Sequence, residues 1–107
     1  MSWTVEFLNE TARDELRALP DDSRARFERI VALISVKGLS QLREPYVKHL
    51  EGKLWEMRMK GKDGIARSIY VAATGQRVVI LHSFMKKTQK TPQSALETAR
   101  TRAKEVE

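Results

Sequence analysis

The chain has 107 residues, enough for one domain with a modest hydrophobic core. It contains no cysteine, which excludes a disulfide framework and thiolate metal sites and fits a reducing cytoplasm. No basic segment followed by an apolar run opens the sequence, and no stretch approaches the roughly 20 apolar residues of a membrane span. We therefore expect neither a signal peptide nor contact with a membrane.

The net charge of +6 is unevenly distributed along the chain. Between residues 53 and 92, nine Lys or Arg residues stand against two acidic ones, and no acidic residue occurs from 64 to 96. A localised positive field of this kind suits a nucleic acid or an acidic protein partner. A solubilising surface would have the same composition, so charge alone leaves both interpretations open.

The N-terminal part predicts a strand and a helical hairpin. In residues 3–7, apolar and polar residues alternate, which predicts a strand with one buried face. Apolar residues three to four positions apart predict helices over 10–19 and 24–37. Asn9 and the cluster 21–23 are expected to cap these helices. We expect the two helices to pack as a hairpin against a sheet.

The remaining residues predict a connecting loop, three strands and a helix. Residues 39–52 are less regular and are expected to form the loop. Strands are predicted over 54–60, 65–73 and 77–84, and the short turns between them predict an antiparallel meander. Four successive apolar residues in the last strand predict a central position covered on both faces. A final helix is predicted over 94–106, which completes a single α+β domain.

The strand over 54–60 alternates between an apolar face and a polar face. The polar face carries Glu56, Arg58 and Lys60. A sheet with helices on one face only would leave these side chains free to bind a ligand.

The sequence offers few routes to catalysis. Two distant histidines without cysteines or clustered carboxylates do not form a ligand set, so no metal and no cofactor are expected. A glycine-rich phosphate loop, a paired-carboxylate motif and a serine-nucleophile motif are all absent. What remains is a basic cluster interleaved with aromatic residues: Arg58, Arg67, Tyr70, His82, Phe84, Lys86, Lys87 and Lys90.

Such a cluster suits RNA cleavage without a metal. Cations stabilise the charge that develops on the phosphate, and aromatic rings stack on unpaired bases. Proton transfer would come from His82, from Tyr70, or from a lysine whose pKa is depressed by neighbouring cations. Ordinary structural roles compete with these: Arg67 in an ion pair, His82 as a hydrogen-bonded strand residue, and Tyr70 or Trp55 in the core.

Several segments together resemble the HigB-like, phage-related branch of the RelE/ParE toxin superfamily. They are Leu-Trp-Glu-Met-Arg at 54–58, Arg-Ser-Ile-Tyr at 67–70, the segment 79–92 and Ala99 in the final helix. The run Phe-x-Lys-Lys-Thr-x-Lys-Thr-Pro within 79–92 is the most specific of them. The resemblance covers essentially the whole chain. It implies a RelE-like toxin with an N-terminal strand, a helical hairpin, a curved, mainly antiparallel sheet of about four strands and a C-terminal helix.

The resemblance also implies a function. Toxins of the RelE type cleave mRNA on the ribosome, and an antitoxin that usually carries a helix-turn-helix domain neutralises them. We therefore expect a cytoplasmic, metal-independent endoribonuclease whose partners are a cognate antitoxin, the ribosome and mRNA, with operator DNA contacted only through the antitoxin. A ParE-like gyrase inhibitor and an inactive homologue that acts only by binding are the alternatives.

Roles within the basic cluster follow from the same resemblance. Arg67 matches a position that holds the scissile phosphate, Arg58 a basic residue on the preceding strand, and Lys86 or Lys87 a basic residue after the last strand. Some HigB toxins use histidines, which makes His82 a candidate for proton transfer. The expected catalytic residues are Arg67, Lys87, His82 and Arg58. The expected RNA-binding residues are Lys60, Tyr70, Phe84, Lys86 and Lys90.

Two positions depart from the family pattern. Glu56 stands where such toxins carry a second basic residue, and no tyrosine follows Pro92 near the chain end. The resemblance therefore does not identify the general acid and base.

Overall fold

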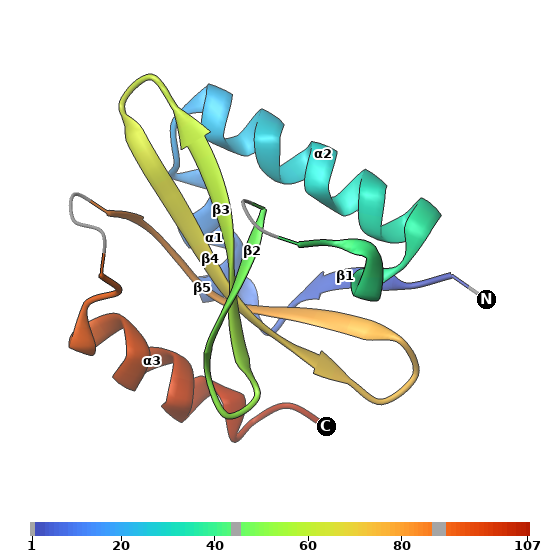
Figure 1. Ribbon diagram of the computed structural model, residues 1–107. Coiled ribbons are helices and arrows are strands. Elements are labelled where there is room, and N and C mark those ends of the chain that lie inside the picture. Colours follow the sequence, from blue (N-terminus) through green and yellow to red (C-terminus); the bar gives the residue numbers. More distant parts are fainter. Residues whose placement is uncertain (1, 44–45, 87–89) are drawn as a thin grey trace.

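The computed structural model describes residues 2–43, 46–86 and 90–107 (Figure 1). The elements, in chain order, are β1 (Thr4–Phe7), α1 (Glu10–Arg17), α2 (Asp21–Lys37), the short 3-10 helix η1 (Leu39–Gln41), β2 (Val47–Glu51), β3 (Leu54–Gly61), β4 (Gly64–Ala73), β5 (Arg77–Lys86) and α3 (Gln93–Ala103). The strands form one sheet in the order β1-β5-β4-β3-β2, in which β1 is parallel to β5 and the other pairs are antiparallel. Within the described ranges, no helix has the length and apolar character needed to cross a membrane.

The predicted α+β class, the helical hairpin, the meander and the C-terminal helix are confirmed. The expected loop over 39–52 is wrong in its second half, because Val47–Glu51 forms β2 and makes five strands instead of four. This strand is short, lies at the edge, and exposes Lys48 and His49 in succession, so the sequence shows no alternation there. The second helix begins at Asp21 rather than at residue 24, because Pro20 occupies the capping position and the acidic residues lie in the first turn.

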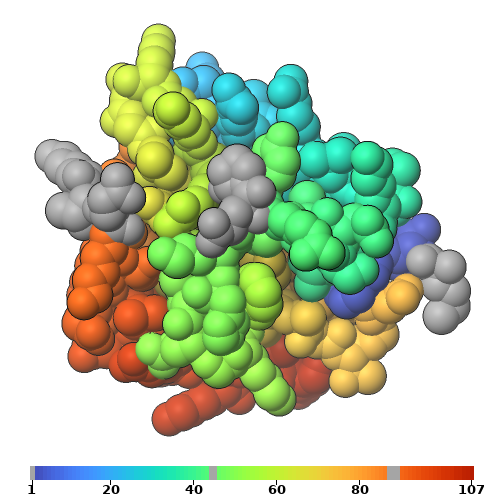
Figure 2. All heavy atoms as spheres, viewed as in Figure 1, coloured from blue at the N-terminus to red at the C-terminus, as the bar shows by residue number. Residues whose placement is uncertain are grey.

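Helices cover both faces of the sheet. Side chains of α1 and α2 pack on one face with Met57, Met59 and Ile80, and α3 packs on the other face with Ile69 and Leu81. Figures 1 and 2 show α3 and the α2–η1 segment on opposite sides of β2. The expectation that helices would leave the second face open is therefore wrong for the part of that face under α3. The predicted central strand is confirmed, because all residues from Val78 to Leu81 are buried.

A bulge between β4 and β5 decides which side chains share the face under α3. Ile69 lies opposite His82, whereas Tyr70 lies opposite Ile80, so Leu81 is the extra residue. Leu81 packs against the apolar cluster under α3, and so does Phe84, although simple alternation would place them on opposite faces. After the bulge, each side chain of β5 therefore points to the face opposite to the one that simple alternation would give.

Candidate functional site

A buried polar cluster lies on the α3 face, beyond its apolar part. Arg58, Arg67 and Phe84 are direct neighbours across β3, β4 and β5. Glu56 precedes Arg58 on the same face and is fully buried. Its carboxylate accepts a hydrogen bond from Arg67, lies 3.4 Å from Nε of Arg58, and accepts the Thr91 hydroxyl at 2.9 Å. Glu56 therefore holds the two arginines and the segment before α3 together.

Lys86 adds a third cation to this cluster. It ends β5 and is only 6% exposed. Burial lowers the pKa of Lys86 from its usual 10.5, the charge of Arg67 lowers it further, and Glu56 opposes the shift. Nε of Arg67 is buried and has no hydrogen-bond partner among the described residues. Three cations around the single carboxylate of Glu56 create an excess positive charge that a phosphate group would neutralise.

A second network lies at the bulge, beside α1. Nδ1 of His82 is 2.9 Å from the carboxylate of Glu15, and the His82 ring stacks on Phe84 with centroids 5.1 Å apart. A carboxylate accepts the proton on Nδ1, so the neutral ring keeps the lone pair on Nε2. The hydrogen bond to Glu15 therefore fixes the orientation of the His82 ring and favours one tautomer of its neutral form.

Arg102 of α3 donates two hydrogen bonds to the same carboxylate of Glu15, at 2.7 and 3.0 Å. Burial by itself raises the pKa of Glu15, but the hydrogen bonds from Arg102 and His82, together with their positive charges, outweigh it and lower the pKa. Arg102 also donates to the carbonyl of Leu81 at 2.8 Å, and the Ser83 N–H lies 3.4 Å from the Glu15 carboxylate. These side chains bond backbone groups of β5 that have no partner strand, because of the bulge and because β1 pairs only with the first half of β5.

The structure thus brings together five of the predicted residues. Arg58, Arg67, Phe84, Lys86 and His82 share one end of the α3 face. Arg67 is 2% exposed and forms the ion pair that the sequence left as its structural alternative. The catalytic and RNA-binding roles of these residues stay predictions.

The other predicted residues lie elsewhere. Tyr70 is 1% exposed and belongs to the core on the opposite face, where burial raises its pKa, so contact with RNA would require it to leave the core. Lys60 is exposed near the end of β3, and Lys90 is exposed before α3. Lys87 lies outside the described residues. Trp55, expected in the core, is 39% exposed and lines a hollow of about 650 Å³ on the Tyr70 side.

Sequence reasoning missed three residues that organise the site. Glu56 was visible only as a departure from the family pattern, although strand alternation already placed it on the face of Arg58. Glu15 and Arg102 gave no local signal, because each is one of several charged residues on an amphipathic helix. Glu15 bonds His82, which is 67 positions away, and Arg102, which is 87 positions away, so only the packing of three elements brings them together.

Comparisons with known proteins identify the fold. The family described as "Phage derived protein Gp49-like (DUF891)" matches residues 14–104. A chain of the archaeal RelE–RelB complex from Pyrococcus horikoshii superposes with a TM-score of 0.60 at 23% identity, covering 79% of this chain and 96% of that chain. A mutant of the E. coli toxin RelE in the free state gives a TM-score of 0.65 at 16% identity, covering 95% and 98%. No curated protein matches the sequence. The architecture is therefore a RelE-like α+β fold.

Proposed function

The chain belongs to the phage-derived Gp49-like family, and on this premise we propose that it is the toxin of a type II toxin–antitoxin pair, of the HigB-like branch. We propose that its activity is metal-independent cleavage of mRNA on the ribosome, in the cytoplasm. One observation carries this proposal: Arg58, Arg67 and Lys86 gather around one buried carboxylate, beside His82. A protein-binding gyrase inhibitor has no need for such a phosphate cradle.

The cluster supplies each task of the cleavage. His82 would take the proton of the ribose 2′-OH through Nε2, and the 2′ oxygen would attack the adjacent phosphorus. The bond from phosphorus to the 5′ oxygen then breaks, which leaves a 2′,3′-cyclic phosphate. Lys86, whose pKa is lowered, would give a proton to the departing 5′ oxygen. Arg58, with 24% of its side chain exposed, would contact the phosphate. The buried Arg67 would contribute its positive charge to the site.

The proposed partners follow from the same premise. One solved structure with this fold is a RelE–RelB complex. For the present chain we propose a cognate antitoxin with a helix-turn-helix domain, which would neutralise the toxin and contact operator DNA. The ribosome and its mRNA would be the target.

Induction in bacterial cells, followed by mapping of new 5′ ends within translated mRNA, tests the proposal. The wild type is expected to arrest growth and create such ends, and an inhibitor of translation should abolish them. Arg58→Ala and Lys86→Ala are expected to reduce cleavage by about 10²–10³-fold, the usual effect of losing one group that stabilises transition-state charge. Lys104→Ala is the control, because Lys104 is exposed at the end of α3, and it should cleave like the wild type.

The alternatives give different results in the same assay. DNA-damage signalling with intact mRNA would indicate a gyrase inhibitor. The absence of any growth effect would indicate a homologue that acts only by binding. Variants at Arg67 and Lys87 should be included, because both are predicted from the sequence to be catalytic.

A further inference from the structure

A second basic site lies at the edge of the sheet, outside the cluster around Glu56. It is a hollow of about 270 Å³ between the first half of α2 and the outer part of β3. Four cationic side chains line it, together with three other residues: Arg26, Arg29, Ile30, Tyr46, Arg58, Lys60 and Ile65. Among the residues that the structure describes, none that lines it is acidic. The sequence pattern indicated Arg58 and Lys60 as candidates but gave no such indication for the two helical arginines.

Three of the four cations that line this hollow are not used in holding the described fold together. Within the described part of the chain, no side-chain hydrogen bond or ion pair involves Arg26, Arg29 or Lys60. Arg26 and Arg29 are exposed and lie three residues apart on one helical face, where like charges repel. Asp22, one turn before Arg26, is engaged elsewhere, since it accepts the backbone N–H groups of Ser23 and Lys62. The hollow therefore concentrates uncompensated positive charge.

Backbone contacts fix the walls of the hollow. The N–H of Lys62 donates to Asp22 at 2.7 Å and joins the β3–β4 turn to the start of α2. A Cβ at Gly61 would come within 2.6 Å of the Asp22 carboxylate, so this approach requires glycine. On the other side, the N–H of Arg58 donates to the carbonyl of Tyr46 at 2.8 Å. The start of α2 and the outer part of β3, which carry these cations, are consequently held in place before any ligand arrives.

Arg58 connects this hollow with the buried cluster. It is one of the residues that line the hollow, and its Nε is 3.4 Å from Glu56, which pairs with Arg67. Cationic side chains are therefore found from Lys86 through Arg58 to α2, with the buried Glu56 among them. Tyr46, 42% exposed, offers a ring on which a base can stack. A single RNA strand has the matching chemistry, since its phosphates are spaced along a flexible backbone that carries stacking bases.

We propose that the hollow lined by Arg26, Arg29 and Lys60 is a phosphate subsite for the RNA strand beside the cleaved bond. This inference rests on the proposed function and extends it to the path of the substrate. The subsite would position the strand so that the scissile phosphate reaches Arg58 and Lys86.

The test is the salt dependence of binding to a short, fluorescently labelled single-stranded RNA, measured by anisotropy. For single strands, log K falls with log salt by about 0.7 for each phosphate neutralised. The double variant Arg26→Ala, Arg29→Ala is expected to bind more weakly and to flatten this slope by about 0.7–1.4. Arg26→Lys, Arg29→Lys keeps the charge and should retain most of the wild-type slope.

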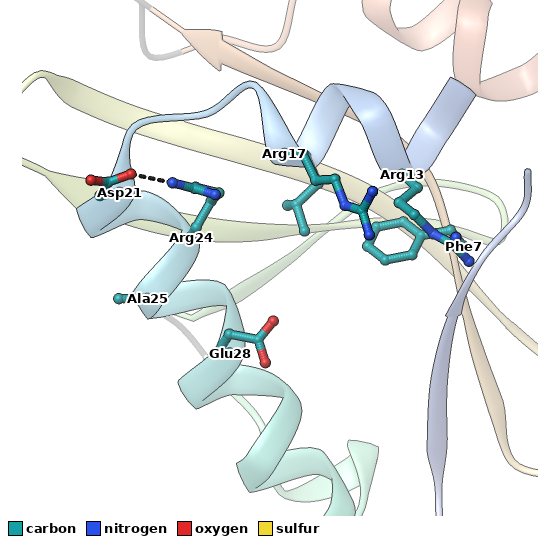
Figure 3. A pocket seen from close by; sticks show the side chains of 8 residues that line it. Phe7, Arg13, Arg17, Asp21, Arg24, Ala25 and Glu28 are labelled. Carbon is teal, nitrogen blue, oxygen red and sulfur yellow. Dashed lines mark hydrogen bonds and ion pairs between the residues drawn. The ribbon is translucent and has the colours of Figure 1, made fainter. Parts of the chain in front are cut away.

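The matched control is Arg13→Ala, Arg17→Ala. These arginines are also exposed and helical, and their loss changes the net charge equally. They line a different hollow, shown in Figure 3, in which Arg24 pairs with Asp21 and Glu28 is present. The control should keep the wild-type slope. An equal change in both double variants would overturn the proposal in favour of a diffuse positive field, and an unchanged slope in the Arg26, Arg29 variant would overturn it as well.

The same variants separate other outcomes. If poly-glutamate binds more tightly than RNA, and this binding is lost in Arg26→Ala, Arg29→Ala, the hollow belongs to an acidic protein partner and the proposal fails. A wild type that cleaves mRNA, with a double variant that binds RNA identically, contradicts the subsite alone. A wild type that shows the expected binding slopes but cleaves nothing contradicts the proposed function and leaves the subsite in place.

Discussion

The sheet face under α3 has two halves of opposite character. In one half, Ile69, Val71 and Leu81 pack with Ala95 and Ala99 of the helix. In the other half, Glu56, Arg58, Arg67 and Lys86 form the charged cluster. The same three strands build both halves, and the bulge of β5 stands at the boundary.

This difference shows how a small domain carries a charged site on a well-packed scaffold. The apolar half fixes α3, and the helix in turn holds Arg102 against Glu15 at the bulge. The segment before α3 supplies Thr91 to Glu56. Burial in one half therefore positions the charges of the other, and the two halves should respond differently to substitution.

The largest loss in the free energy of unfolding is expected for a substitution in the charged half. Glu56→Ala leaves Arg67 buried without its carboxylate, and removing one partner of a buried pair costs about 3–5 kcal/mol. Urea unfolding should show this as a lower midpoint. Glu51→Ala is the control: it breaks the exposed pair with Arg100, which solvent screens, and should move the midpoint little. Equal midpoints for the two variants would show that Glu56 is not structural.

Substitutions in the apolar half should lower stability because they remove packing contacts. Leu81→Ala removes a fully buried side chain between the sheet and α3 and is expected to cost about 2–5 kcal/mol in the free energy of unfolding. Val36→Ala, at a position that is 81% exposed, should stay within about 0.5 kcal/mol of the wild type. If Leu81→Ala lowers the free energy of unfolding no more than Val36→Ala does, the result would contradict the burial of this half.

The smallest loss in the free energy of unfolding is expected at the bulge of β5, between the two halves. Glu15→Gln weakens the charge-assisted hydrogen bonds to Arg102 and His82 and should cost about 1.5 kcal/mol at neutral pH. Because folding lowers the pKa of Glu15, its contribution is present above the usual value of 4.5 and is lost as the pH falls below it. The wild type should therefore lose more stability than the variant on acidification below pH 4.5.

Urea unfolding at a series of pH values measures this difference. Asp14→Asn, an exposed neighbour on α1, is the control and should follow the wild type. If Glu15→Gln also parallels the wild type throughout the acid range, the ionic network at the bulge contributes nothing to folding.

The sequence predicted much of the fold for local reasons. Spacing predicted the helices, and alternation placed Glu56 and Arg58 on one face of β3, as the structure has them. It missed β2, whose exposed edge position removes the alternation. Beyond Leu81, simple alternation would place Ser83 on the face of Leu81, whereas the bulge puts Phe84 there. A bulge depends on contacts with distant residues, and here those are Glu15 and Arg102.

By itself, the sequence determined that a cluster of cations and aromatic residues exists and which strands carry it. The tertiary structure decided how the described cations are buried and paired. Arg58 and Arg67 face each other across two strands, yet one is partly exposed and the other is buried and paired. The reason is their distance from the sheet edge: β4 lies between two long strands, whereas the pairing of β2 with β3 stops at Met57, one residue before Arg58. Strand order is set by contacts far apart in the chain, and no local pattern encodes it.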